Sequence, residues 1–191
     1  MTANVLEGCK IALVHDWLTG MRGGEKCLEV LCELFPDADL YTLIHQKGEL
    51  SDTIEAMPIH TSFVQHLPFG LKKYRHYLPL FPTAIEQFDL SSFDLVITSS
   101  HAVAKGVLTG PDQLHVCMCY SPIRYAWDLQ HQYLAESNMV SGVKSFFARW
   151  ILHKIRMLDV RTAHGVDHFI AISKFISRRI QKVYSRESFI I

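Results

Sequence analysis

Several side chains that could bind or activate a substrate follow predicted strands, at the points where apolar runs end. In chain order they are Asp16, His101, Lys105, Arg124, Tyr125 and Asp128. Ligands of open α/β sheets bind outside the carboxyl ends of strands, so His101, directly after the run 93–99, is well placed to meet a substrate. Segment 120–128 combines arginine, aspartate and aromatic rings, a mixture suited to the hydroxyl groups and C–H faces of a sugar. The alternatives are a structural histidine and a loop whose aromatic rings cap the core.

A glycine pair, Gly23 and Gly24, stands immediately before a helical pattern. Glycine lets a ligand approach the backbone closely. A helix start also offers unpaired N–H groups and a positive dipole end, which suit a phosphate or another anion. The alternative is a turn between strand and helix that needs glycine for a positive φ.

The alternation of apolar runs and amphipathic segments predicts the fold class. Strands are expected at 10–14, 38–44, 93–99, 114–120, 167–171 and 189–191, and helices at 25–35, 78–88, 140–163 and 174–184. A short strand followed by a helix is expected within 59–69. This order predicts an α/β protein with a Rossmann-like, doubly wound, mostly parallel sheet flanked by helices. A chain of 191 residues suffices for a single domain, residues 1–191, with its own core.

The long predicted helix 140–163 has two interpretations. Its apolar side carries Val143, Phe146, Phe147, Trp150, Ile151 and Leu158, and Arg149, His153 and Arg156 lie on roughly the opposite side. A core helix with a solvated basic face is the favoured interpretation. A basic amphipathic helix bordered by tryptophan, in peripheral contact with an anionic membrane, is the other.

The composition excludes several classes of protein. Lysine plus arginine equals aspartate plus glutamate, at 19 each, so no nucleic-acid partner is indicated. The five cysteines have the spacing of neither a disulfide framework nor a zinc site, which predicts reduced thiols and no metal. Without a signal peptide or a spanning apolar run, we expect a cytoplasmic protein, or one held peripherally on the inner face of the cell membrane. Dinucleotide-binding, P-loop and hydrolase-elbow motifs are absent from the sequence.

Four blocks occur in the order HDWLTGMRGGEKCLE, SFDLVITSSHAVAKGV, CYSPIRYAWDL and DHFIAISKFISRRIQKVY. Together they resemble the amino-terminal, acceptor-binding domain of family-four retaining glycosyltransferases, which have the two-domain GT-B fold. The similar sub-group acts on bacterial polysaccharides and lipid-linked oligosaccharides. The third block departs from the family at Ser121, where histidine is common.

The resemblance implies transfer of a hexose from a nucleotide-sugar to a saccharide or lipid-linked acceptor with retention, in cell-surface polysaccharide synthesis, without metal or cofactor. It implies a catalytic role for His101 beside the transferred sugar, with backbone N–H groups of Gly23 and Gly24 directed toward the donor diphosphate or the acceptor. Lys105, Arg124, Tyr125 and Asp128 are then expected on the acceptor side. Asp16 is expected to orient an acceptor hydroxyl.

The family's nucleotide-sugar-binding half is expected after Ile191, so the chain resembles one half of a GT-B enzyme. The isolated chain is therefore expected to transfer sugar poorly, and the face meant for the other half is expected to favour self-association. The alternative function is a non-catalytic, Rossmann-like binding module for a glycan or a partner chain. An epimerase or phosphorylase of the same two-domain fold is a weaker alternative.

Overall fold

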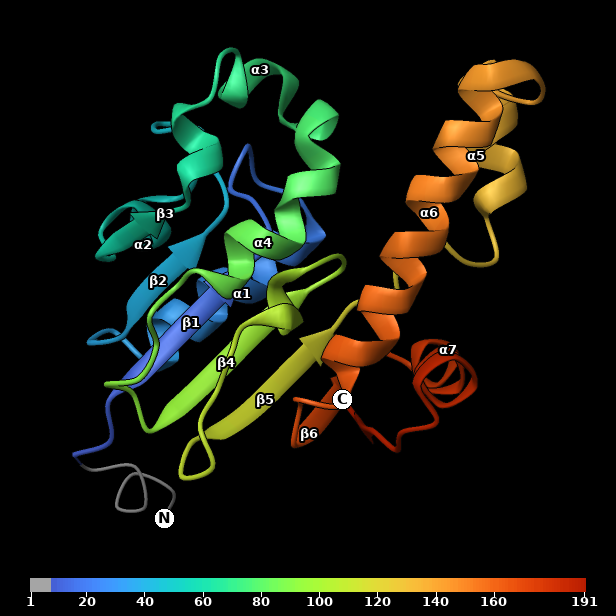
Figure 1. The fold of residues 1–191 in the computed structure, drawn as a ribbon. Helices are drawn as coiled ribbons and strands as arrows, with labels where there is room; N and C mark the ends of the chain where they lie inside the picture. Colours follow the sequence, from blue (N-terminus) through green and yellow to red (C-terminus); the bar gives the residue numbers. More distant parts are fainter. Residues whose placement is uncertain (1–7) are drawn as a thin grey trace.

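One parallel sheet forms the centre of the molecule. The computed structural model describes residues 8–191, and Figure 1 shows strands side by side with helices around them. The strands are β1 (Ile11–His15), β2 (Asp39–Thr42), β3 (Ile59–Thr61), β4 (Leu95–Ser100), β5 (Leu114–Cys119), β6 (His168–Ala171) and β7 (Phe189–Ile190). Their order is β3-β2-β1-β4-β5-β6-β7, with parallel pairing throughout. The α/β, Rossmann-like, doubly wound fold predicted from the sequence is confirmed.

The strand order reverses between β1 and β4. From β1 the chain runs outward through β2 and β3, then returns to place β4 on the other side of β1. At the carboxyl end of this central pair, His15 lies in register with Ser99. Connections leave a reversal of this kind in opposite directions, and open α/β sheets bind ligands in the crevice that results. The segments that follow β1 and β4 therefore flank the expected binding crevice.

Alternate residues of β1 belong to different hydrophobic cores. Ala12 and Val14 belong to the core that includes α4 (Phe81–Glu86). Leu13 belongs to the core that includes α1 (Gly23–Leu34). Because successive strand residues point to opposite faces, α1 and α4 cover opposite sides of the sheet.

The outer strands carry a third core beneath α7 (Lys174–Tyr184). Cys117 and Cys119 of β5 belong to this core together with Ile180 of α7. The intervening Met118 packs instead against the core of α1, so α7 and α1 lie on opposite faces. This agrees with right-handed crossovers, because the chain moves in opposite directions across the sheet from β1 to β2 and from β6 to β7.

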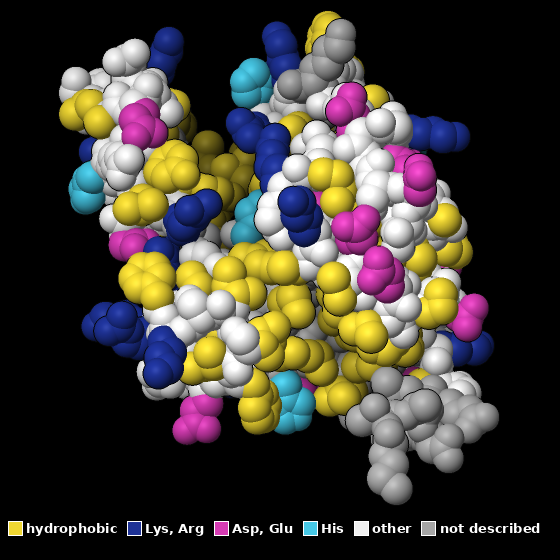
Figure 2. All heavy atoms as spheres, turned by 180° about the vertical axis from the view of Figure 1, so that it is seen from behind, with side chains coloured by type: hydrophobic (Ala, Val, Ile, Leu, Met, Phe, Trp, Pro, Cys, Tyr) yellow, Lys and Arg dark blue, Asp and Glu magenta, His cyan; other side chains and the backbone are white. Residues whose placement is uncertain are grey.

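The other helical segments include two groups that project from the sheet. The segments are α2 (Asp52–Glu55), η1 (Phe63–His66), α3 (Gly70–Lys73), η2 (Tyr74–Leu80), η3 (Ala104–Gly106), α5 (Gln130–Glu136) and α6 (Gly142–Ala163). Figure 1 shows α5 and the amino-terminal half of α6 rising beyond the carboxyl ends of the strands, with α3 rising on the other side. Seen from behind in Figure 2, the surface is hollowed between these two lobes. Within residues 8–191, no helix is both long enough and apolar enough to cross a bilayer.

The predicted elements agree with the structure except at short helices and some ends. The helix predicted at 174–184 is α7, with these same ends. The region predicted as one helix at 78–88 contains the end of η2 and then α4. Helices α2 and α5, of four and seven residues, were not predicted, because such short segments show no clear helical periodicity.

The core interpretation of helix 140–163 was wrong for its amino-terminal half. Val143, Phe146, Phe147 and Trp150 are 73%, 67%, 57% and 53% exposed. The residues of α6 that are buried are instead Ser145, Leu152, Ile155, Asp159 and Ala163. The helix therefore turns a partly polar stripe toward the protein and leaves its aromatic stripe in solvent.

Candidate functional site

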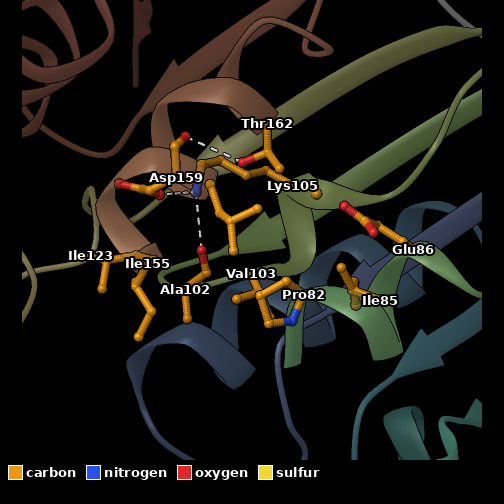
Figure 3. Close-up of a pocket in the computed structure, with 12 residues that line it drawn as sticks. Pro82, Ile85, Glu86, Ala102, Val103, Lys105, Ile123, Ile155, Asp159 and Thr162 are labelled. Atoms are coloured by element: carbon orange, nitrogen blue, oxygen red, sulfur yellow. Dashed lines mark hydrogen bonds and ion pairs between the residues drawn. The ribbon is translucent and has the colours of Figure 1, made fainter. Parts of the chain in front are cut away.

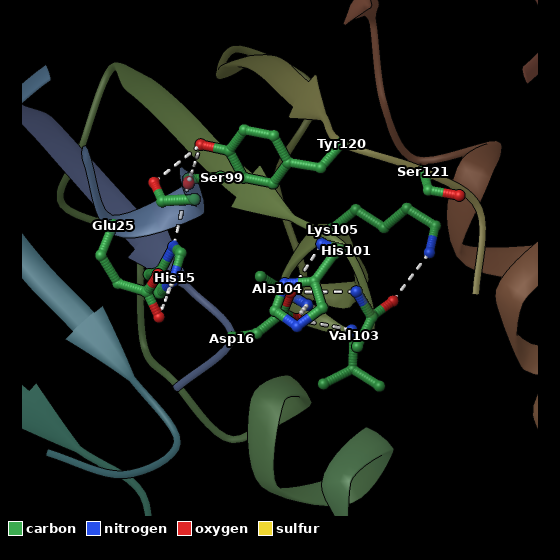
Figure 4. Close-up of polar contacts among 12 residues, drawn as sticks. His15, Asp16, Glu25, Ser99, His101, Val103, Ala104, Lys105, Tyr120 and Ser121 are labelled. Atoms are coloured by element: carbon green, nitrogen blue, oxygen red, sulfur yellow. Dashed lines mark hydrogen bonds and ion pairs between the residues drawn. The ribbon is translucent and has the colours of Figure 1, made fainter. Parts of the chain in front are cut away.

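The carboxylate of Asp16 anchors the loop that follows β4. Asp16 is fully buried. Its Oδ2 accepts backbone N–H bonds from His101 at 2.7 Å and Ala102 at 2.9 Å, and its Oδ1 accepts from Val103 and Ala104 at 2.7 Å each (Figure 4). Burial raises the pKa of Asp16, but the neighbouring imidazole and these hydrogen bonds outweigh it and hold the pKa well below its usual range. Asp16 is therefore ionised and inaccessible, so the expectation that it orients an acceptor hydroxyl directly does not fit this geometry.

The same carboxylate orients the imidazole of His101. Nδ1 of His101 lies 3.0 Å from Oδ2 of Asp16, and the His101 side chain is 33% exposed. The ring meets Trp17 edge-on, with centroids 4.5 Å apart. Burial lowers the pKa of His101, but the Asp16 carboxylate outweighs it and raises the pKa above its usual value. The contact with Asp16 occupies Nδ1 and leaves Nε2 available for a ligand.

A hydrogen-bond chain joins the ends of three strands to the first turn of α1. Nδ1 of His15 lies 2.9 Å from Oγ of Ser99, which lies 2.8 Å from the hydroxyl of Tyr120. That hydroxyl donates to the carbonyl of Gly24 at 3.1 Å. Because Tyr120 has one hydrogen and gives it to a carbonyl, the hydrogen count assigns Ser99 as donor to Tyr120 and His15 as donor to Ser99. The chain holds the start of α1 against the strand ends.

The start of α1 also includes a buried carboxylate, Glu25. Its Oε2 accepts the backbone N–H of Arg22 at 3.1 Å. Its Oε1 lies 3.9 Å from Nε2 of His15, too far for a hydrogen bond. Burial raises the pKa of Glu25, but interactions with His15 and the helix start outweigh it, so the pKa is lowered. The negative charge of Glu25 works against binding of an anion close to it.

The two glycines of α1 differ in what a side chain would meet. Neither has a positive φ, so the turn interpretation that required one is wrong. A Cβ at Gly24 would lie 3.4 Å from the Tyr120 ring and 3.6 Å from the His15 ring, whereas a Cβ at Gly23 would meet no atom of the described residues within 4 Å. Gly24 therefore lies against the hydrogen-bond chain, and Gly23 faces open space that a ligand could occupy.

The three binding residues predicted in the loop after β5 have different surroundings. Arg124 is exposed, and its charge acts to lower the pKa of His101. The hydroxyl of Tyr125 is buried and has no hydrogen-bond partner in the described part of the chain; burial raises its pKa. Asp128 instead binds Arg179 of α7 at 2.5 Å and is half exposed. Asp128 therefore ties the loop to α7.

Lys105 has internal partners. It is 3% exposed, pairs with Asp159 of α6 and donates to the carbonyl of Ala102 at 3.0 Å. Burial lowers the pKa of Lys105, but Asp159 outweighs it and raises the pKa. Asp159 also accepts from Trp127 at 2.7 Å and from Tyr184 at 3.0 Å. Lys105 thus joins η3 to α6, and the expectation that it lines the acceptor side does not fit its burial.

A small cavity lies beside this ion pair. Ala102, Val103, Lys105, Ile155 and Asp159 are among its lining residues (Figure 3), and its volume is about 20 Å³. That is room for about one water molecule. The cavity is therefore no sugar site, and the crevice above the strand ends is the candidate.

The structure brings together part of the predicted set and adds residues that spacing did not indicate. His101, Asp16, Gly24, Arg124 and Tyr125 lie around the carboxyl ends of β1, β4 and β5, whereas Lys105 and Asp128 serve internal contacts. The additional residues are His15, Trp17, Glu25, Ser99 and Tyr120. Most of them end strands or directly follow them, which is the signal that could have found them. Ser121 is buried and donates to the carbonyl of Pro122, so its hydroxyl is engaged locally.

The described residues form no cluster of three or more histidine, cysteine, aspartate or glutamate side chains that could hold a metal ion. The class that the observations define is an α/β protein with a Rossmann-like sheet and a network of polar side chains at the strand switch point. No family model matches the chain, and no curated protein matches it.

Proposed function

We propose that this chain is the acceptor-side half of a retaining glycosyltransferase, which transfers a hexose from a nucleotide-sugar to a saccharide or lipid-linked acceptor in cell-surface polysaccharide synthesis. The observation that carries the proposal is the His101 imidazole, one-third exposed at the strand switch point and fixed through Nδ1 by the buried Asp16. The resemblance of the four sequence blocks supplies the reaction class. The fold is compatible with it and with many other functions.

His101 is suited to contact a sugar hydroxyl. With Nδ1 held by Asp16, its Nε2 presents a hydrogen-bond donor at a fixed position when the ring is charged. Preorganised donors stabilise a charge-separating transition state without reorganising as the reaction proceeds. In our proposal His101 donates to the transferred hexose, while Asp16 acts as a positioning residue that favours the charged form of the ring and orients it.

The neighbouring groups support recognition of a polar acceptor. The Tyr125 hydroxyl is buried and has no partner within residues 8–191, which costs free energy unless a ligand or water satisfies it. Arg124 adds an exposed cation suited to hydroxyl or phosphate oxygens. Gly23 leaves open space at the start of α1. In our proposal Tyr125 and Gly23 contact the acceptor, and the Arg124 cation contacts the donor diphosphate.

A binding titration by NMR tests the proposal on the chain itself. The probes are a neutral disaccharide and a short-chain prenyl-diphosphate disaccharide, compared for wild type, His101→Ala and the control His60→Ala, an exposed histidine on β3. We expect saturable binding by wild type and His60→Ala, and at least about tenfold weaker binding by His101→Ala. Equal affinities for all three proteins would contradict the proposal.

The second candidate is a non-catalytic binding module for a glycan or a partner chain. The observation in its favour is that Asp16 and Lys105, two residues expected in the transferase site, have only internal partners. A transfer assay with UDP- and GDP-hexoses separates the two, run on this chain alone and with a nucleotide-sugar-binding half supplied as a second chain. The transferase proposal predicts little transfer by the chain alone and release of nucleotide when both halves are present. A binding module predicts no release in either case.

A further inference from the structure

We infer that the exposed side of α6 docks on an anionic lipid surface. Four exposed apolar side chains lie there, Val143, Phe146, Phe147 and Trp150, and Val140 precedes the helix; all five are between 53% and 73% exposed. We call these five residues the aromatic ridge. The core does not need them, because the opposite side of α6 is the buried one. Large aromatic side chains in water are unfavourable, so an exposed cluster of them indicates a surface that is covered in use.

Basic residues extend the aromatic ridge along the same side of α6. Val143, Phe147, Trp150, Lys154 and Arg161 follow one another at spacings of three, four or seven residues, which places them on one side of an α-helix. Nζ of Lys154 lies 5.7 Å from the centre of the Trp150 ring, which confirms that these two side chains share that side. At 1.5 Å per residue the line from Val143 to Arg161 is about 27 Å long. Aromatic rings bordered by lysine and arginine are the arrangement of helices that lie in a membrane interface.

The charge of α6 favours anionic lipid over a second copy of this chain. The helix has three exposed basic residues, Lys144, Lys154 and Arg161, and a single acidic one, Asp159. Arg149 and Arg156 are partly buried and bond to other residues of the protein. Asp159 is buried and paired with Lys105, so it does not offset the exposed cations. Two copies meeting ridge to ridge would bring like charges together, which is unfavourable. Anionic head groups instead neutralise them while the rings enter the interface.

The position of the ridge is compatible with action at a membrane surface. Figure 1 shows that the amino-terminal half of α6 projects beyond the carboxyl ends of the strands, the same end of the sheet that carries His101. Docking there would hold the crevice close to the lipid head groups. The inference does not depend on glycosyl transfer, since vesicle binding is measured without a sugar.

Vesicle co-sedimentation tests the inference. The probes are vesicles of phosphatidylcholine alone and vesicles that also contain phosphatidylglycerol. We expect the chain to bind only the anionic vesicles, more weakly at high salt, with a blue shift of tryptophan fluorescence that Trp150→Phe abolishes. Phe146→Ser/Phe147→Ser and Lys154→Glu/Arg161→Glu should each weaken binding at least about tenfold. These positions are exposed or on the exposed line, so folding is retained and is checked by circular dichroism.

The matched control is Val30→Ser/Leu34→Ser, which removes two apolar side chains exposed by 52% and 64% on α1. It should bind vesicles as wild type does. Two outcomes would overturn the inference directly: no preference for anionic vesicles, or equal losses of binding in the ridge and control variants. A third would be that wild type does not bind vesicles but sediments as a dimer, and that Phe146→Ser/Phe147→Ser dissociates this dimer. The last outcome would assign the ridge to a second copy.

Discussion

Oδ2 of Asp16 lies 3.0 Å from Nδ1 of His101 and also accepts the backbone N–H of the same residue at 2.7 Å. One buried carboxylate therefore fixes both the loop after β4 and the imidazole at its start. The two residues are 85 positions apart in the chain and meet because β1 and β4 are neighbours in the sheet. This relationship underlies the proposed site.

Replacement of Asp16 by asparagine should destabilise the protein strongly. The carboxylate accepts four backbone N–H bonds, whereas an amide offers one acceptor oxygen and turns an NH₂ group toward donors. At least two buried N–H groups would lose a partner, at about 1 to 3 kcal/mol each, so we expect a loss of about 2 to 6 kcal/mol in the free energy of unfolding. Urea denaturation measures it.

Asp128→Asn is the matched control for that measurement. Asp128 is half exposed and makes one ion pair, with Arg179, and exposed pairs contribute about 0 to 1 kcal/mol. A loss for Asp16→Asn no larger than the loss for Asp128→Asn would show that the Asp16 carboxylate does not anchor the loop.

The His101–Asp16 pair should make stability depend on pH in a defined direction. The pKa of His101 is raised in the folded protein above its unfolded value of about 6.5. The contribution of the charged ring is therefore fully present below about pH 6.5 and is lost as pH rises through the folded pKa. The difference in unfolding free energy between wild type and His101→Gln should therefore shrink as the pH rises above about 6.5. NMR titration of the ring would contradict this if the pKa fell below about 6.5.

Sequence patterns predicted the helices and strands of the fold better than the contacts between their side chains. Apolar runs placed the strands, and the rule that ligands meet strand ends placed His101 at the crevice. Nothing in the spacing indicated that Asp16 would accept N–H groups 85 to 88 residues away, or that Lys105 would pair with Asp159 of α6. Such pairs depend on strand order and helix packing, which only the folded chain defines.

The orientation of α6 shows a second reason why the sequence did not predict all contacts of the fold. Its aromatic stripe has helical periodicity, and periodicity marks a side of the helix without showing which neighbour covers it. In the structure the buried side includes Asp159, whose charge is satisfied by Lys105, with Trp127 and Tyr184 as further donors. Hydrophobicity alone would have ranked that side as the solvated one.

The losses of stability caused by removing Lys105 and Asp159 should not be additive. Lys105→Met leaves the carboxylate of Asp159 buried without its cation, and we expect a loss of about 3 to 5 kcal/mol in unfolding free energy. In Lys105→Met/Asp159→Asn the charge is gone, so the combined loss should fall below the sum of the single losses by about 1 to 3 kcal/mol. Strictly additive losses in urea denaturation would show that the two groups are not coupled.

Gly23→Ala should change ligand affinity without reducing the stability of the fold. A Cβ at Gly23 meets no atom of residues 8–191 within 4 Å. Alanine favours the helix over glycine, so the free energy of unfolding should stay equal or rise by up to about 1 kcal/mol. If a ligand occupies the open space, affinity for the prenyl-diphosphate disaccharide should fall. Isothermal titration calorimetry checks this; unchanged affinity would remove Gly23 from the site.

Tyr125→Phe should likewise change ligand affinity without reducing stability, because it removes a buried hydroxyl. The hydroxyl has no partner among the residues described, so its loss should leave stability unchanged or slightly higher. If the hydroxyl binds the acceptor, saccharide affinity should fall by about twofold to tenfold. Tyr77→Phe is the contrasting control, because that exposed hydroxyl donates to the carbonyl of Pro68 at 2.7 Å. A drop in stability for Tyr125→Phe without a change in affinity would give Tyr125 a structural role only.

The most direct test of the account is to locate a bound saccharide by NMR. The amide and histidine-ring resonances of the chain are followed while the prenyl-diphosphate disaccharide is added to millimolar concentration. The account predicts that the largest shifts occur at Gly23, His101 and Tyr125, with the His101 ring among them. Shifts that leave these residues unmoved and centre elsewhere on the molecule would contradict it.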